Sequence, residues 1–498
     1  MYIKDNHKMW LATSDKPIYL EPSMANRHGL IAGATGTGKT VTLKVLAEDF
    51  SDMGVPVFVA DIKGDLSGMC KSGSPNKHIL RSVENMGIEG FDYNSYPVTF
   101  WDVFGKQGLP VRTTVSEMGP ELLARLLGLN DIQSGILRIV FRIADDKNLL
   151  LIDLKDLRSM LVYVGDNAKE FKLTYGNISS QSIGAIQRAL LRLEDEGGEV
   201  FFGEPTLDLS DWFEWDENGR GMMNVLECSE LFQHPLLYST FLLWMLSEIY
   251  EMLPEAGDLD KPKFAFFFDE AHLLFDGAPK ALIELVERVA RLIRSKGVSV
   301  WFITQNPTDI PDSVLGQIGN RVQHALRAYT PNDQKALRAA ARSFRVNESF
   351  DTEEALQLLG VGEALVSVLD ADGIPSIVEK AGILPPHSSM NAVDAVTLQA
   401  TTLASPMRDK YAAEIDRESA YEVLTEKQAE EERLQLEEAK RSELEELIAQ
   451  KEKKLTTKKT SSRRGKTPWE KAVDTTVTTI GREVGKKLVR GIFGILSK

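Results

Sequence analysis

Residues 33–40 read Gly33-Ala34-Thr35-Gly36-Thr37-Gly38-Lys39-Thr40, between an apolar run from His28 to Ala32 and a helix-like stretch from Val41 to Phe50. Glycines let such a loop fold into a cup whose backbone N–H groups point inward, and the following helix adds the positive end of its dipole. Glycines at this spacing before Lys-Thr, between a strand and a helix, are typical of a phosphate-binding loop. The stretch therefore predicts that the chain binds a nucleoside triphosphate.

The residue types of this loop have predicted roles. Lys39 is placed to reach the β- and γ-phosphates, and the hydroxyl of Thr40 is placed to ligate Mg²⁺. The alternative, a Gly-rich turn that binds nothing, does not account for both the spacing and the flanking elements. We expect the nucleotide to contact Gly33, Ala34, Thr35, Gly36, Thr37, Gly38, Lys39, Thr40 and Val41.

Length and composition are those of a large globular protein. The 498 residues, 43% of them hydrophobic, leave room for about two to four domains. The two cysteines, Cys70 and Cys228, form neither a metal-ligand pattern nor a disulfide framework, which indicates a reducing compartment, and we expect the cytoplasm. The polar start and the lack of any run of about 18 apolar residues predict neither an export signal nor a membrane span.

Charge is unevenly distributed along the chain. A net charge of −15 argues against a broad nucleic-acid-binding surface, yet residues 456–498 contain eleven Lys or Arg against three acids. This basic tail also has a helical apolar stripe, for which docking on the body or a partner chain, binding to a membrane surface, and contact with nucleic acid are all open. The members of the stripe are Val473, Val477, Ile480, Val484 and Leu488.

Strand-like and helix-like runs alternate through most of the chain, which predicts an α/β fold with a largely parallel sheet. One of the expected helices is Pro235–Met252, between the strands expected at Met222–Leu226 and Lys263–Phe268. Between about Arg112 and Gly198 the apolar spacing is helical, and we interpret this stretch as an insertion. The expected strands are Val55–Asp61, Pro97–Phe104, Met222–Leu226, Lys263–Phe268, Val298–Thr304 and Val322–Ala328.

These patterns suggest a division of the chain. Residues 416–455 are dominated by Glu, Lys, Arg and Leu, and fit either a long solvated helix or a short coiled coil. The expected parts are a short β element (1–22), a first part of the core (23–110), the helical insertion (111–200), a second part of the core (201–406), a charged helix (407–455) and a basic linker with an amphipathic tail (456–498).

An apolar run that ends in two acids, Phe264-Ala265-Phe266-Phe267-Phe268-Asp269-Glu270, predicts a strand that reaches the same sheet edge as the phosphate loop. Asp269 would hold a Mg²⁺-bound water, and Glu270 would polarise the attacking water. The next expected strand ends at Gln305, which could touch both the γ-phosphate and that water, or could merely cap the following turn. Glu270 indicates a hydrolase and not only a binding protein.

Phosphoryl transfer also needs positive charge near the transition state, which a neighbouring subunit's arginine often supplies. The helix expected at Leu285–Lys296 carries Arg288, Arg291 and Arg294. These arginines can also form an ordinary solvated face. Arg294 is the first candidate for the catalytic arginine, and Arg321 is the second.

Together the motifs resemble the HerA/FtsK superfamily of ring-forming ATPases, and closely the bacterial HerA-like proteins of the DUF853 group, over residues 15–385. The resemblance rests on five segments: residues 27–40, Asp61-Ile62-Lys63-Gly64-Asp65, residues 267–272, Thr304-Gln305-Asn306-Pro307 and Gly319-Asn320-Arg321. It implies a RecA-like (ASCE) P-loop NTPase with a mostly parallel sheet, and an additional strand between the phosphate-loop strand and the second strand. The helical insertion and a charged helical C-terminal tail complete the expected fold.

The resemblance also implies roles for site residues. ATP and Mg²⁺ are the implied cofactors, with Lys39 and Thr40 on phosphate and metal, Asp269 and Glu270 as metal partner and water activator, and Gln305 as the sensing residue. Arg294 resembles a trans-acting arginine of the FtsK branch, and Arg27 stands where HerA relatives have an arginine ahead of the loop. Asp61 belongs to a family signature whose role the spacing does not explain.

The expected function is that of a Mg²⁺-dependent ATPase that forms a homo-oligomeric ring, as a hexamer, and moves DNA. The rival is an ATP-dependent scaffold or switch that binds protein partners through the charged helix and tail. A small-molecule kinase fits less well, because Glu270 and Gln305 suit water as the acceptor.

Overall fold

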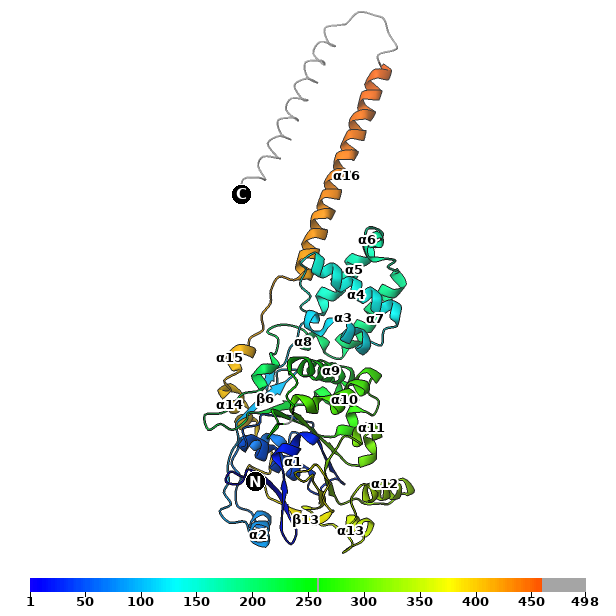
Figure 1. Ribbon diagram of the computed structural model, residues 1–498. Helices are drawn as coiled ribbons and strands as arrows, with labels where there is room; N and C mark the ends of the chain where they lie inside the picture. The colour runs from blue at the N-terminus through cyan, green and yellow to red at the C-terminus, as the bar shows by residue number, and fades with distance from the viewer. Residues whose placement is uncertain (258, 459–498) are drawn as a thin grey trace, which may run out of the picture. The chain divides into compact units, whose positions relative to one another are not determined.

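A mixed sheet of 13 strands organises Met1–Leu424, the first of two units in the chain; the second begins at Thr425 (Figure 1). The computed structural model describes residues 1–257 and 259–458. No helix within these ranges combines the length and the apolarity needed to cross a bilayer.

The order of the strands places sequence-distant segments side by side. From edge to edge they are β1 (Tyr2–Ile3), β2 (Lys8–Thr13), β13 (Glu379–Ile383), β12 (Glu363–Ser367), β11 (Asn320–His324), β4 (Gly29–Ala32), β10 (Val298–Thr304), β9 (Phe264–Phe268), β5 (Val57–Asp61), β8 (Met223–Glu227), β6 (Val98–Asp102) and β7 (Leu109–Pro110), while β3 (Pro17–Leu20) pairs with β2.

All neighbours from β11 to β7 are parallel, whereas β12, β13, β1, β2 and β3 form an antiparallel extension at one edge. Two strands, β10 and β9, separate the phosphate-loop strand β4 from the second strand, β5, where the resemblance implied one additional strand. The predicted RecA-like, mostly parallel α/β sheet is therefore confirmed. In the antiparallel extension, β1, β2 and β3 lie where the sequence analysis expects a short β element, whereas it did not identify β12 and β13.

Strand β9 shows why the centre of the sheet is buried on both faces. Phe264, Phe266 and Phe268 belong to one apolar core, and Ala265 and Phe267 to the other. Alternate side chains of a strand point to opposite faces, so a fully apolar run is stable only between two layers of helices.

The two layers come from different parts of the chain. On one face α1 (Lys39–Asp52) buries Leu43 and Leu46. On the other lie α9 (Pro235–Met252), with bounds as predicted, and α10 (Lys280–Leu292). A third, smaller core holds α12 (Pro331–Arg342) and α13 (Thr352–Leu358) against the antiparallel edge.

Six helices fill the stretch in which the sequence predicts a helical insertion. Asn130 and Asp153 each form a capping box with the residue three positions later, which fixes where two of these helices begin. The six helices are α3 (Val115–Leu126), α4 (Asp131–Asp146), α5 (Leu154–Asp166), α6 (Ala168–Tyr175), α7 (Ser180–Asp195) and α8 (Gly198–Phe201).

Several predicted strands differ from the observed ones by one or two residues at an end, and one differs by more. The strand expected at Val322–Ala328 begins at Asn320 and ends at His324. The backbone N–H of Ala34 still donates to the carbonyl of Ala325 at 2.9 Å, but the N–H of the next residue, Leu326, donates to the carbonyl of Leu356 in α13 at 3.2 Å, so the chain leaves the sheet there.

The charged segment near the C-terminus is helical, but it does not form one helix from residue 407 as the expected division had it: a short helix, α15 (Arg408–Tyr411), comes first, and the long helix begins at Ala420. Helix α16 spans Ala420–Lys458, and several of its leucines are exposed, among them Leu434 and Leu444. The amphipathic stripe predicted at 473–488 lies outside the described residues.

Candidate active site

The phosphate loop joins β4 to α1 and has the backbone that its glycines allow. Gly33, Gly36 and Gly38 have φ angles of 151°, 75° and 120°, a region that side chains disfavour. Thr37 Oγ1 donates to the carbonyl of Ala34 at 2.7 Å. An internal hydrogen bond thus stabilises the loop, which leads directly into the N-terminus of α1.

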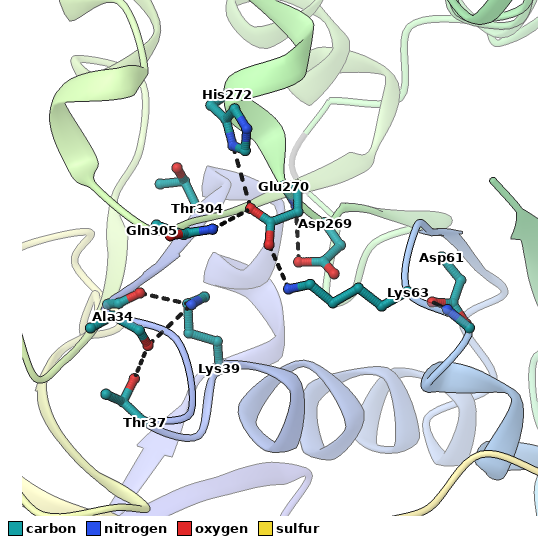
Figure 2. A network of polar contacts seen from close by, with 12 residues as sticks. Ala34, Thr37, Lys39, Asp61, Lys63, Asp269, Glu270, His272, Thr304 and Gln305 are labelled. Carbon is teal, nitrogen blue, oxygen red and sulfur yellow. Dashed lines mark hydrogen bonds and ion pairs between the residues drawn. The ribbon is translucent and has the colours of Figure 1, made fainter. Parts of the chain in front are cut away.

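Lys39 lies folded over its own loop (Figure 2). Its ammonium donates to the carbonyls of Gly33 and Ala34 at 2.7 and 3.3 Å. Burial lowers the pKa of Lys39, while the negative charges of Glu270 and Asp269 counteract that shift. The ammonium therefore occupies a site where further negative charge stabilises it.

A buried histidine, His324 at the end of β11, packs against the phosphate loop and the first helix. Its Nε2 is 2.8 Å from Thr42 Oγ1, and its Nδ1 is 3.0 Å from the carbonyl of Glu363. A Cβ on Gly33 would lie 2.5 Å from the Cβ of His324, so only glycine fits there. The sequence offered no motif for this residue; only the adjacency of β11 and β4 reveals it.

The acid pair follows β9 at the same edge of the sheet. Asp269 Oδ1 accepts a hydrogen bond from the backbone N–H of Glu270 at 2.9 Å, and Glu270 has a φ of 48°, unusual for a residue with a side chain. Burial raises the pKa of Asp269 to about 6, against the opposing charge of Lys63. The turn thus holds two buried carboxyl groups next to each other.

Gln305 lies where the sequence analysis expects it, directly after β10. Because β10 separates β4 from β9, the end of this strand lies between the phosphate loop and the acid pair. The amide nitrogen of Gln305 is 3.4 Å from Glu270 Oε2 (Figure 2). The order of the strands therefore brings Lys39, Gln305 and Glu270 together beyond the carboxyl ends of three adjacent strands, β4, β10 and β9.

Two further side chains contact Glu270. Lys63, which follows β5, places its ammonium 2.5 Å from Glu270 Oε1, and His272 Nδ1 lies 3.4 Å from Oε2. Burial pushes the pKa of Glu270 up, but the hydrogen bond and charge of Lys63, with smaller effects of Gln305 and His272, bring it below its ordinary value. The sequence analysis gave neither residue a role, although β5 beside β9 and the closeness of His272 to Glu270 in the chain are the signals.

Asp61, the first of the two acids in the signature Asp61-Ile62-Lys63-Gly64-Asp65, makes its side-chain hydrogen bonds within its own turn and not with the phosphate loop. It ends β5 and accepts hydrogen bonds from the backbone N–H groups of Gly64 and Leu66 at 2.8 and 2.9 Å. Burial, with the charges of Asp65 and Glu227, raises its pKa to about 7. Its contacts are those of a residue that closes the turn carrying Lys63.

The candidate arginines lie at the amino ends of the parallel strands, opposite the carboxyl ends that the acid pair and Gln305 follow. Arg294 precedes β10, Arg27 precedes β4, and Arg321 is near the start of β11, whereas the acid pair and Gln305 follow the other ends of their strands. Arg321 donates to the carbonyls of Leu315 and Ser343, and burial lowers its pKa. Within one chain the structure does not bring these arginines to the acid pair.

The donor atoms available for a metal are oxygens. Across residues 1–257 and 259–458, no three His, Cys, Asp or Glu side chains gather into a metal-binding group. Thr40 in the first turn of α1 and the buried Asp269 offer a hydroxyl and a carboxylate, the donors that Mg²⁺ takes from protein while phosphates and water complete its shell. This donor set fits a nucleotide-bound Mg²⁺.

The family described as "Helicase HerA-like C-terminal" matches residues 6–498. The chain belongs to this family. Membership agrees with the predicted HerA/FtsK superfamily and its P-loop ATPase fold.

Two curated proteins are similar in sequence to this chain. A probable helicase of Methanocaldococcus jannaschii is 24% identical over 354 residues, covering 69% of this chain and 60% of its own length. DNA double-strand break repair helicase HerA of Saccharolobus solfataricus is 23% identical over 352 residues, covering 68% of this chain and 61% of its own. The chain thus spans about three fifths of the length of these two relatives.

Among solved structures, the bacterial conjugative coupling protein TrwBdeltaN70 in its unbound monoclinic form matches with a TM-score of 0.50 and 15% identity. The match covers 78% of this chain and 91% of that one. At this level of identity the likeness concerns the fold alone.

Proposed function

We propose that this protein is a Mg²⁺-dependent ATPase of the HerA/FtsK type. One observation carries the proposal: the ends of β4, β10 and β9 present Lys39, Gln305 and Glu270 at a single sheet edge, with Gln305 in contact with Glu270 at 3.4 Å. Carboxyl ends of parallel strands are where such folds bind their ligands.

In this proposal the phosphates replace contacts that the loop makes with itself. The ammonium of Lys39 transfers from the carbonyls of Gly33 and Ala34 to the β- and γ-phosphates. The loop N–H groups and the N-terminus of α1 hold the remaining phosphate oxygens. Mg²⁺, held by Thr40 and through water by Asp269, would neutralise charge that develops on the phosphates.

Glu270 and Gln305 act on the water. Glu270 accepts a proton from the attacking water, and Gln305 orients that water while touching the γ-phosphate. The burial of Asp269 and Glu270 supports this assignment, because electrostatic effects are stronger where water is excluded.

We further propose that copies of the chain form a ring, as a hexamer, that couples hydrolysis to movement of DNA in the cytoplasm. The arginines support an assembly: Arg294 and Arg321 lie at the edge opposite Glu270, so either could reach a phosphate only in a neighbouring copy. Relatives named as DNA helicases support DNA as the partner, and the free thiols of Cys70 and Cys228 support a reducing compartment.

Helix α16 favours a second candidate, an ATP-dependent scaffold that binds protein partners. Leu434, Leu444 and Leu447 are exposed along this charged helix, and such residues can pair with another helix. On this view hydrolysis is slow and no DNA is moved.

Turnover of ATP with and without duplex DNA separates the two candidates. A DNA motor hydrolyses ATP faster when duplex DNA is present, and the stimulation weakens as salt rises because phosphate contacts release counterions. Basal hydrolysis that DNA does not change at any ionic strength would favour the scaffold. An absence of Mg²⁺-dependent ATP binding would contradict both.

A further inference from the structure

The signature Asp61-Ile62-Lys63-Gly64-Asp65 builds a turn that faces the acid pair. The carboxylate of Asp61 accepts from the backbone N–H groups of Gly64 and Leu66, and Gly64 has a φ of 73°. Because β5 pairs with β9, this turn lies beside the end of the strand that carries Glu270. Figure 2 shows the side chain of Lys63 extending from the turn to Glu270.

Both carboxylate oxygens of Glu270 are held by other side chains. Lys63 contacts Oε1 at 2.5 Å, the shortest of these contacts, while Gln305 and His272 lie 3.4 Å from Oε2. A general base must present an oxygen to the attacking water within hydrogen-bond distance. The Lys63 contact therefore competes directly with the role proposed for Glu270.

The exposure of the two side chains allows Lys63 to break its ion pair with Glu270. The side chain of Lys63 is 43% exposed, whereas that of Glu270 is 7% exposed, so the lysine is the partner with room to change its position. Figure 2 shows Lys39 in the phosphate loop and Lys63 extending from its turn to the acid pair, so both ammonium groups lie at the end of the sheet where the γ-phosphate would be held. A γ-phosphate carries more negative charge than a carboxylate and can attract an ammonium on a flexible stem.

We propose that Lys63 is a positioning residue that restrains Glu270: its ammonium keeps the carboxylate from the attacking water, and its release toward the γ-phosphate limits turnover when no DNA is present. The inference rests on the proposed ATPase function and gives the Asp61–Asp65 signature a role, in which Asp61 shapes the turn and Lys63 controls the base. Lysine suits this role because a single point charge releases more readily than the two-pronged contact of an arginine.

The test measures ATP turnover of the full chain with Mg²⁺ and without DNA. Lys63→Met should raise kcat about threefold to fivefold, the factor expected for a partly exposed ion pair. Lys63→Arg should hold kcat at or below that of the wild type, because it retains the charge. Lys106→Met is the matched control: Lys106 pairs with Glu230 at 2.6 Å in exposed loops, and its loss should leave kcat unchanged.

A second comparison shows whether Lys63 acts through Glu270. Adding Lys63→Met to Glu270→Gln should leave the residual rate of Glu270→Gln unchanged, since there is no longer a carboxylate to release. ADP affinity and the unfolding midpoint are measured for every variant, and Lys63→Gln replaces Lys63→Met if the latter does not fold.

The outcomes are distinct. A kcat for Lys63→Met at or below the wild-type value, with ADP affinity and stability intact, overturns the restraint. Acceleration that persists in the Glu270→Gln background also overturns it, because Lys63 would then act elsewhere. If the wild type binds ADP but hydrolyses no ATP, the proposed ATPase function itself fails.

Discussion

His324 and Thr42 connect the sheet to the phosphate-loop helix: Nε2 of the imidazole lies 2.8 Å from the threonine Oγ1. The carbonyl of Glu363, 3.0 Å from Nδ1, can only accept, so Nδ1 carries the proton and Nε2 accepts from the hydroxyl. Burial lowers the pKa of His324 to about 4, and the ring is therefore neutral at physiological pH.

This pairing predicts acid sensitivity of folding. The folded pKa of His324 is depressed below the unfolded value of about 6.5, so its stabilisation is present above pH 6.5 and is lost as pH falls toward 4. The loss is about 2 kcal/mol at pH 5. His28, whose pKa burial also lowers to about 4, adds a similar loss.

Urea unfolding at pH 7 and pH 5 measures this effect. His324→Gln removes only the contribution of this imidazole, so its unfolding free energy at pH 5 relative to pH 7 should be about 2 kcal/mol higher than in the wild type, while His28, Asp61 and Asp269 titrate in both proteins. The exposed His78→Gln serves as the control and should behave as the wild type. An unchanged difference in His324→Gln would contradict the prediction.

Glu270 and Gln305 should separate binding from hydrolysis. Glu270→Gln keeps shape but cannot take a proton, so kcat should fall by about 10²- to 10⁴-fold while ATP affinity is retained. Gln305→Ala should likewise abolish turnover and spare binding. The exposed Gln317→Ala provides the comparison, and normal turnover in Gln305→Ala would remove that residue from the mechanism.

Gly33 should tolerate no side chain. In Gly33→Ala the new Cβ would meet the Cβ of His324 at 2.5 Å, at a φ of 151°, so we expect a loss of about 2–3 kcal/mol in stability and a large loss of ATP affinity. Gly36→Ala meets no atom within 4 Å and should cost only about 1 kcal/mol of backbone strain. Thermal unfolding and nucleotide titration of both variants test this, and equal losses would speak against a steric role for His324.

A trans-acting arginine should be detectable by mixing. Arg294→Ala and Glu270→Gln should each be nearly inactive alone. In mixed assemblies some interfaces combine an intact Arg294 with an intact Glu270, so ATPase activity should partly return. Mixtures that stay as inactive as the separate variants would argue against Arg294, and Arg321→Ala is then the next variant to mix.

The sequence predicted what short-range patterns encode. Glycine spacing located the loop, and fully apolar runs such as Phe264–Phe268 located the buried parallel strands, because their signal lies within a few adjacent residues. The order of the strands depends on long-range pairing, which no local pattern records. The role of His324 depends on the pairing of β11 with β4, and the contact between Lys63 and Glu270 depends on the pairing of β5 with β9. For that reason the sequence predicted neither.

The phosphate loop is completed by a late strand. The backbone N–H of Gly362 donates to the carbonyl of Thr37 at 3.0 Å, and the carbonyl of Glu363 in β12 holds the ring of His324. A ribosome makes the loop early and β12 much later, so a growing polypeptide carries the glycine-rich segment without its support for most of translation. Capture of nucleotide in the proposed manner thus becomes possible only once nearly the whole sheet has been synthesised.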